Sequence, residues 1–349
     1  MKNKRILKLV GSIFIAVMLA AMLLPAGCAP QDDDNDEEGP LTIGIFQIIS
    51  HPALDSAREG FKDAFKVGLE DAGLTEADVV FTERNAAGSM DLCYTIADYF
   101  VAQDVDLICA IATPCVIAAT TAVEGTDIPV VFNSVTNPED AGIENLEEPG
   151  GQVTGVSDVA PVEPNMQLII DILAANNLTF ETLGVMYNAG EPNSVYQVDV
   201  QLTEALDELG LNITVEEATV STGADVPSAA EALVAADVDA IWIPTDNTVV
   251  AGIEGLVAVC EDNDIPLVAS DVATVERGAL ASWGMEYYTV GYLSGEMAVD
   301  ILLDGTDPGT IPIGFVPANL LYVYPEEAER QGVTIPQSII DQADEVIVD

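Results

Sequence analysis

The sequence VAQDVD at residues 101–106 returns as VAADVD at residues 234–239. Two shorter echoes accompany it in the same order. They are TIGIF at 42–46 with TLGVM at 182–186, and DIP at 127–129 with DIP at 264–266. The offsets are 133, 140 and 137 residues, so the spacing changes only by the length of a loop or helix. Because the matches keep one order, they predict that the chain contains two equivalent halves.

Short apolar segments alternate with helical patterns in the first half of the chain. The segments are rich in β-branched residues, as is typical of parallel strands covered on both faces. We expect strands at Leu41–Ile48, Val79–Asn85, Asp106–Ala112 and Pro129–Val135, and helices at Pro52–Ala72, Ser89–Ala102 and Pro114–Val123. The same order returns at residues 181–272. The sequence therefore predicts the α/β class, with two Rossmann-like lobes that each contain a parallel sheet.

Four remaining segments do not extend either half by simple succession. They are a strand at Gln152–Asp158, a helix at Tyr287–Leu303, a strand at Leu320–Tyr324 and a short helix at Pro325–Gln331. We interpret them as chain crossings that form a hinge of several strands, which permits closure over a ligand. The expected limits are 41–157 plus 285–317 for lobe 1, and 158–284 plus 318–349 for lobe 2.

The start of the chain has the pattern of an export signal. Residues 1–8 are basic, and the 16 residues Leu9–Leu24 carry no charge. A membrane-spanning helix needs about 20 apolar residues, so this stretch favours a signal peptide. The following PAGC resembles a bacterial lipobox, although Pro25 stands where that pattern usually has Leu. We expect residues 1–27 to be a lipoprotein signal peptide and Cys28 to carry the lipid; an ordinary secretory peptide is the alternative.

An acidic run, QDDDNDEEGP at residues 31–40, follows the signal. It lacks the Gly and the distal Glu that an EF-hand calcium loop requires at fixed spacing. We therefore interpret residues 28–40 as a solvated tether. The protein is expected to be exported and anchored by its lipid on the outer face of the cytoplasmic membrane.

The charge balance is strongly acidic, with 10 Lys and Arg against 59 Asp and Glu and a net charge of −49. Four of the cations lie in residues 1–27, so the remainder carries −53. Such a chain is excluded from nucleic-acid binding, which needs clustered cations. The mutual repulsion weakens the folded state at ordinary ionic strength, and molar salt shortens the Debye length to about 3 Å. We therefore predict a halophilic protein from a saline habitat.

Polar residues follow the predicted strands at the ends where open parallel sheets bind ligands. Two facing lobes would enclose these loops in one cleft. Several loops begin a helix, so capping is the alternative role of each residue, but six converging polar loops favour ligand contact. The candidate ligand-binding residues are Gln47, His51, Thr113, Ser134, Thr136, Asn188, Glu191, Asn193, Ser194, Thr245, Asp246, Asn247 and Asp271.

The chemistry of these loops indicates a zwitterionic ligand. None of the six remaining cations lies in them, which argues against phosphate, sulfate and dicarboxylates. Helix N-terminal amides and hydroxyls, for example at Thr113 or Ser194, can hold a single carboxylate. An ammonium group needs acids, and Glu191, Asp246 and Asp271 are available. A free amino acid with an aromatic or apolar side chain fits best; a sugar or nucleoside is the weaker alternative.

Few residues suggest catalysis. His51 is the only His, and the sequence has no GxSxG, P-loop or GxGxxG motif. Cys93, Cys109, Cys115 and Cys260 show no CxxC spacing; we expect buried thiols, with disulfides as the alternative in an exported protein. We therefore expect no catalytic residue, no metal and no cofactor.

Several longer runs resemble the substrate-binding lipoproteins of ABC importers, in particular the tryptophan/tyrosine type. They are HPALDSAREGF, AIATP, VVFNSVTNPEDAG, PGGQVTGVSD, YNAGEPNS, WIPTDNTVV, ERGALAS and GVTIPQSI. The resemblance implies a type I periplasmic-binding-protein fold and partners that are a membrane permease and an ATPase. It also implies that the polar residues of AIATP, NSVTNP, YNAGEPNS, PTDN and ASD form the site.

The expected function is capture of a small solute outside the cell by closure of two lobes, and its delivery to the permease without chemistry. We expect a monomer. A ligand sensor that signals to a membrane receptor is the alternative, and an enzyme on the same scaffold is less favoured. Loss of ligand uptake on deletion separates the importer from the sensor, and turnover of bound ligand identifies an enzyme.

Overall fold

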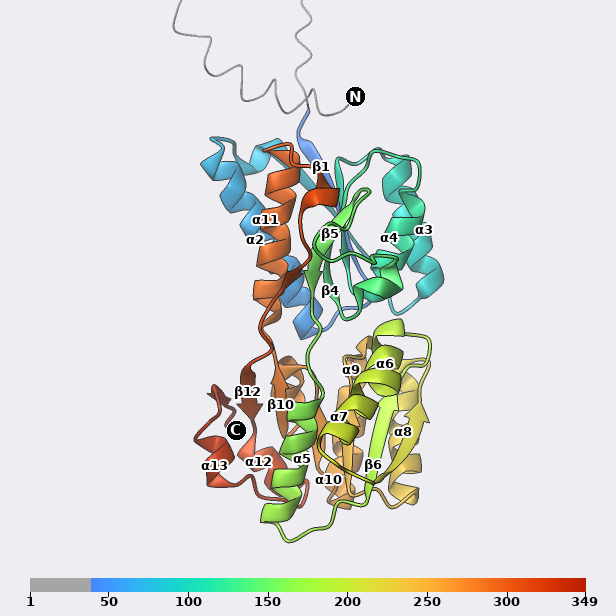
Figure 1. Ribbon diagram of the computed structural model, residues 1–349, viewed down its shortest axis with the longest axis vertical. Helices are drawn as coiled ribbons and strands as arrows, with labels where there is room; N and C mark the ends of the chain where they lie inside the picture. The colour runs from blue at the N-terminus through green and yellow to red at the C-terminus, as the bar shows by residue number, and fades with distance from the viewer. Residues whose placement is uncertain (1–38) are drawn as a thin grey trace, which may run out of the picture.

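Two sheets, one in each lobe, lie end to end along the long axis of the molecule (Figure 1). The computed structural model describes residues 39–349. The predicted signal peptide 1–27, Cys28 and nearly all of the tether 28–40 therefore lie outside the described residues. No helix within residues 39–349 has the length and apolar character needed to cross a bilayer.

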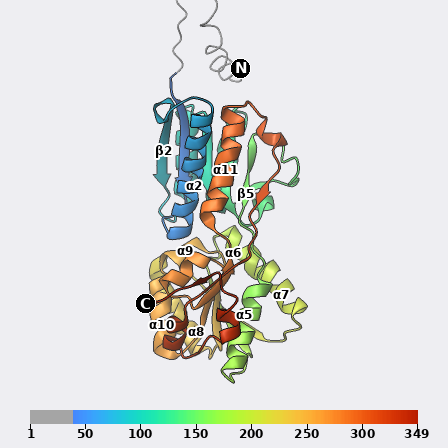
Figure 2. The same cartoon turned by 90° about the vertical axis from the view of Figure 1, so that its left-hand side faces the viewer.

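Lobe 1 contains a six-stranded parallel sheet with the order β11-β5-β4-β3-β1-β2. Helices α2 and α11 cover one face, and α3 and α4 cover the other (Figures 1 and 2). The strands are β1 (Leu41–Gln47), β2 (Val79–Asn85), β3 (Leu107–Ile111), β4 (Val130–Val135), β5 (Val153–Ser157) and β11 (Gly314–Phe315). The helices are α2 (Pro52–Asp71), α3 (Met90–Ala102), α4 (Thr113–Ala122) and α11 (Tyr287–Leu302).

Lobe 2 contains a seven-stranded sheet with the order β13-β12-β10-β9-β8-β6-β7, in which only the pair β10–β12 is antiparallel. Its strands are β6 (Thr182–Tyr187), β7 (Thr214–Thr219), β8 (Ala240–Ile243), β9 (Leu267–Ala269), β10 (Ala281–Gly284), β12 (Leu320–Val323) and β13 (Glu345–Val346). Its helices are α5 (Glu163–Ala175), α6 (Pro192–Tyr196), α7 (Thr203–Glu208), α8 (Val226–Ala235), α9 (Asn247–Ala251), α10 (Ile253–Asn263), α12 (Pro325–Arg330) and α13 (Gln337–Ile340).

The sequence repeat produces the same hydrogen bond in both lobes. Asp106 accepts a 2.8 Å hydrogen bond from the backbone N–H of Thr42, at the start of β1. Asp239 accepts a 2.8 Å hydrogen bond from the backbone N–H of Thr182, at the start of β6. Each aspartate ends one copy of the VAxDVD sequence, so the two lobes begin their central strand pair in the same way. The predicted duplication is therefore matched by an equivalent hydrogen bond in each lobe.

The α2 and α11 helices pack unusually closely in lobe 1. A Cβ atom on Gly291 would come within 1.8 Å of the backbone oxygen of Ala57, and one on Gly295 within 2.4 Å of that of Phe61. Glycine on α11 therefore allows the two backbones to approach each other, and α11 packs against lobe 1 although the preceding strand, β10, belongs to lobe 2.

The chain crosses between the sheets after β5, after β10 and after β11 (Figure 1). This confirms the predicted α/β class and its hinge of several strands. Every strand and helix predicted by residue range begins and ends within one residue of its prediction. On the basis of sheet membership, we propose the limits 41–157 plus 285–317 for lobe 1 and 158–284 plus 318–349 for lobe 2.

The four cysteines in the described part of the chain are free and buried, as expected. The Cys93 and Cys115 sulfurs lie 3.7 Å apart between α3 and α4. Burial raises the pKa of Cys109 and Cys115 well above the ordinary value, so these thiols stay protonated.

Candidate ligand-binding site

A pocket lies between the lobes, where strands of both sheets end. Its enclosed volume is about 10 Å³, so the lobes lie close together over it. Most of its polar residues follow strands directly, as expected for open parallel sheets. Its walls are formed by His51, Leu54, Ala112, Ser134, Thr136, Asp158, Asn193, Thr245, Asp246, Asn247, Val250, Asp271 and Tyr287.

The pocket brings together most of the residues that the sequence singles out. Eight predicted residues line it: His51, Ser134, Thr136, Asn193, Thr245, Asp246, Asn247 and Asp271. The other five predicted residues are buried or partly buried behind the wall: Gln47, Thr113, Asn188, Glu191 and Ser194.

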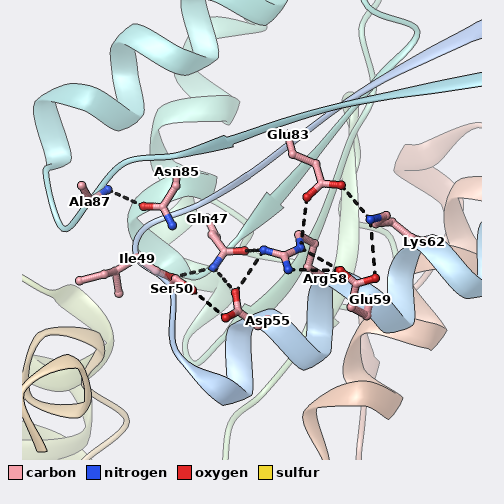
Figure 3. A network of polar contacts seen from close by, with 10 residues as sticks. All are labelled: Gln47, Ile49, Ser50, Asp55, Arg58, Glu59, Lys62, Glu83, Asn85 and Ala87. Carbon is pink, nitrogen blue, oxygen red and sulfur yellow. Dashed lines mark hydrogen bonds and ion pairs between the residues drawn. The ribbon is translucent and has the colours of Figure 1, made fainter.

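Gln47 takes part in a charged network at the end of β1 (Figure 3). Its Oε1 accepts a 2.8 Å hydrogen bond from Arg58, and its Nε2 donates to Asp55 over 2.8 Å. Arg58 also contacts Glu83, which bonds Lys62 over 2.8 Å. Gln47 therefore supports the first two turns of α2, because Asp55 and Arg58 of that helix engage its amide nitrogen and oxygen.

Glu191 is a structural acceptor at the beginning of α9. Its Oε1 accepts hydrogen bonds from the Thr248 backbone over 2.9 Å and from the Thr248 hydroxyl over 2.6 Å. Its Oε2 accepts from the Asn247 backbone over 3.2 Å and from the Asn247 side chain over 2.5 Å. Both carboxylate oxygens are thus occupied within lobe 2.

Asp246 is the N-cap of α9 and is occupied in the same way. It accepts hydrogen bonds from the Val249 backbone over 2.7 Å, from the Asn188 backbone over 2.6 Å and from the Ser194 hydroxyl over 2.6 Å. Burial, followed by the nearby Glu191 charge, raises the pKa of Asp246 to about 7. The capping role therefore applies to Asp246, and Asn188 and Ser194 support it.

A second pair of acids has oxygens with fewer internal partners. Asp158 follows β5 and accepts hydrogen bonds from the hydroxyls of Thr136 and Tyr287, each over 3.0 Å. Asp271 follows β9 and accepts one from the Ala273 backbone over 2.9 Å. Burial raises the pKa of both aspartates to about 6, and the charge of Asp158 contributes to the shift at Asp271.

Asp158 and Tyr287 are site residues that the sequence reasoning missed. Both lie on crossing segments, where the repeat offers no equivalent position to compare. The PGGQVTGVSD run of the family resemblance ends at Asp158 and contains the only signal that pointed there. Leu54 and Val250 were also missed. Both are apolar residues inside helices, whereas the prediction considered only the polar residues of the loops before those helices.

The lobe 1 wall has two backbone positions with positive φ. Ala112, just before α4, has φ 76° and ψ 151°, and Ser134 on β4 has φ 58°. Such conformations are strained for residues other than glycine and are concentrated at functional sites. The N-terminus of α4 follows Ala112, and the buried Thr113 hydroxyl has no partner among the described residues. This end of the helix can receive one carboxylate.

One hydrogen bond joins the lobes directly across the pocket. His51 Nε2, at the start of α2, lies 3.1 Å from the side-chain oxygen of Asn247 on α9. Burial lowers the pKa of His51 to about 4, so the ring is neutral at neutral pH. No Lys or Arg within residues 39–349 lines the pocket. In the same part of the chain, no group of three or more His, Cys, Asp or Glu side chains could hold a metal ion.

Residues 42–347 match the family of ABC transporter substrate binding proteins. The chain belongs to this family. It is also 36% identical to the tyrosine-binding protein of Clostridioides difficile, over 89% of this chain and 88% of that protein. As an ABC transporter substrate-binding protein, it is expected by family to act outside the cytoplasm on a small molecule and to work with a permease and an ATPase.

Solved structures of family members show the same fold. One from Streptococcus pneumoniae, in complex with L-Trp, is 32% identical with a TM-score of 0.79, and covers 88% of this chain and 100% of that chain. A ligand-free, open structure from Clostridium difficile is 33% identical with a TM-score of 0.62, over 88% and 100%. This substrate-binding protein thus has an overall arrangement closer to the L-Trp complex, although the two relatives are equally distant in sequence.

The fold-level expectation of a type I periplasmic binding protein is confirmed as well. A leucine-binding protein from Thermotoga maritima, 14% identical, has a TM-score of 0.56 over 83% of this chain and 87% of that chain. At this identity the likeness concerns the fold alone.

Proposed function

We propose that this substrate-binding protein captures a free aromatic amino acid outside the cytoplasmic membrane and delivers it to its permease without chemical change. The observation that supports this proposal most directly is the distribution of charge in the pocket. Asp158 and Asp271 come from crossing and lobe 2 segments, and neither forms an ion pair with a Lys or Arg of residues 39–349. An ammonium group is the ligand feature that satisfies them both.

The carboxylate of the ligand is proposed to lie at the N-terminus of α4. The N–H groups in the first turn of a helix lack intrahelical partners, and the helix dipole favours a negative charge there. Ala112, which precedes α4, lines the pocket, and the adjoining Thr113 hydroxyl is buried behind it without a partner among the described residues. Of the three acids that the sequence offers for the ammonium group, we keep Asp271 and replace Glu191 and Asp246, whose oxygens cap α9, by Asp158.

The aromatic preference is supported by the relatives that are named for tyrosine or carry L-Trp. Leu54 and Val250 add apolar surface to the pocket from opposite lobes. A ligand that contacts both lobes stabilises the closed arrangement by its own binding energy.

A thermal-shift screen in molar NaCl tests this function with the 20 amino acids, sugars and nucleosides. Bound ligand raises the melting temperature by mass action, so we expect increases with L-Tyr or L-Trp and none with sugars or nucleosides. A response to sugars or nucleosides alone would contradict the proposal. Mass spectrometry of the released ligand should recover it intact, since turnover would indicate an enzyme.

The proposed lipid anchor is tested by replacing Cys28. The Cys28→Ala variant of the full chain should lose membrane association while its ligand affinity stays unchanged. Retention of the variant in the membrane fraction would contradict lipidation at this residue.

A further inference from the structure

The tautomer of His51 is determined by a short chain of hydrogen bonds. Glu191 accepts backbone N–H groups on both carboxylate oxygens, so it acts as an acceptor toward its neighbours. The Asn247 side-chain nitrogen donates to Glu191 over 2.5 Å, which leaves the Asn247 oxygen facing His51 Nε2 at 3.1 Å. His51 Nε2 must therefore carry the proton, and Nδ1 carries a lone pair.

The lone pair on His51 Nδ1 is buried and accepts no hydrogen bond from the described residues. His51 lines the pocket with 7% of its surface exposed, and Nδ1 has no hydrogen-bond partner among the described residues. Burial keeps the pKa of this ring near 4, so Nδ1 remains an acceptor at neutral pH. An acceptor buried without a partner costs free energy, which a ligand that supplies a donor there would recover.

Asn193 presents a second acceptor of the same kind. Its side-chain nitrogen donates to the Thr245 carbonyl oxygen over 2.7 Å, which fixes the orientation of the amide. Its side-chain oxygen is buried without a partner, and Asn193 also lines the pocket. Asn193 and Asn247 both donate to Glu191 Oε2, so the two acceptors belong to one hydrogen-bonded group.

We propose that His51 Nδ1 and Asn193 Oδ1 form an acceptor subsite for a hydrogen-bond donor on the ligand's side chain, namely a phenolic hydroxyl or an indole N–H. The inference rests on the proposed function, because the ammonium group goes to the charged aspartates, which bind it more strongly than neutral acceptors do. A site with buried acceptors discriminates against an analogue that lacks the donor, since the acceptors then stay unpaired. The protein is thus selective for tyrosine or tryptophan over phenylalanine.

Calorimetric titration of the wild-type protein in molar NaCl tests the subsite without any mutation. L-Tyr or L-Trp should bind at least about tenfold more tightly than L-Phe. O-methyl-L-tyrosine and 1-methyl-L-tryptophan, which lack the donor, should lose the same factor relative to their parents. Equal affinity for L-Tyr, L-Trp, L-Phe and the methylated analogues would overturn the subsite and leave the aromatic amino acid function standing. Failure of every aromatic amino acid to bind would overturn both.

The His51→Phe variant tests the residue itself. It keeps an aromatic ring in the wall but removes the acceptor, so the affinity ratio of the preferred ligand to L-Phe should fall toward one. The variant also removes the Nε2 bond to Asn247, which affects every ligand alike, so the readout is the affinity ratio and not the affinity for L-Phe itself. A wild-type ratio in this variant would overturn the role of His51. The ligand series above remains decisive if the variant does not fold.

Discussion

The hydroxyl of Tyr287 donates a 3.0 Å hydrogen bond to Asp158, which joins two of the crossing segments beside the pocket. Asp158 follows β5, and Tyr287 begins α11 directly after β10 leaves lobe 2. The carboxylate that we assign to the ligand's ammonium group is therefore part of the hinge itself. A charge that binds there acts on the segments that must bend when the lobes close.

Removing either carboxylate charge should weaken ligand binding. We expect Asp158→Asn and Asp271→Asn each to reduce affinity about 10- to 100-fold, the loss that corresponds to about 1.5–3 kcal/mol for a hydrogen bond to a charged group. Calorimetric titration with the best ligand of the screen measures it. Glu276→Gln is the matched control, because it removes the same charge from an exposed position near Asp271. Equal losses in all three variants would indicate a general charge effect.

Ligand affinity should decrease as the pH falls through about 6. Burial raises the pKa of Asp158 and of Asp271 to about 6, so below this pH an ammonium group must displace protons. His51 adds to the trend, because burial lowers its pKa to about 4 and protonation of the ring therefore opposes its burial between the lobes. Titrations between pH 5 and 8 should give a slope that Asp271→Asn reduces; a flat profile would contradict the assignment.

The stability of the ligand-free protein should change with pH in the opposite direction. The folded-state pKa values of Asp158, Asp246 and Asp271 lie above their unfolded values, so the folded state binds more protons as the pH falls from about 7 toward 4. His51 opposes this over the same window, because its folded pKa is lowered. The stabilising effect of the three carboxylates on the free energy of unfolding exceeds the opposing effect of one imidazole. The melting temperature should therefore rise as the pH is lowered from 7.5 to 5. A fall would show that these acids are not buried as described.

Salt should stabilise the protein. The chain after residue 27 carries −53, and within residues 39–349 ion pairs engage Arg58, Lys62, Lys66, Arg277 and Arg330 on the surface. Screening of the many repulsive contacts outweighs the loss of these few attractive ones. Thermal unfolding should therefore shift upward from 0.1 M to molar NaCl, whereas an unchanged or lower melting temperature would contradict the halophilic interpretation.

The close packing of α2 on α11 should be sensitive to a single methyl group. Gly291→Ala places Cβ within 1.8 Å of the Ala57 backbone oxygen, so the helices must separate. We expect a loss of about 1–3 kcal/mol in the free energy of unfolding. Gly223→Ala is the control, since its Cβ would meet nothing closer than 3.4 Å. Denaturant unfolding compares the two, and equal stabilities would contradict the close approach.

The fold could be predicted from the sequence because both halves of the duplication share apolar strand patterns and short polar runs. The repeated runs contain Thr42 and Asp106 and their counterparts in lobe 2, but the hydrogen bonds that pair them come from the structure. Loop positions after strands were equally accessible. The role of each polar side chain in its loop was not, because Gln47 is engaged by Arg58, 11 residues away, and Asp246 by Ser194, 52 residues away. The crossing residue Asp158 has no counterpart in the repeat, so only the structure places it in the pocket.

The burial of Cys93, Cys109, Cys115 and Cys260 has a practical consequence for optical sensing. A version that begins after Cys28 would present no accessible sulfur from these four positions to a maleimide dye. A single cysteine introduced on the rim of the pocket would then carry the only fluorophore, and its emission would report the approach of the lobes. The molecule is in this respect a scaffold for a reagentless amino-acid probe.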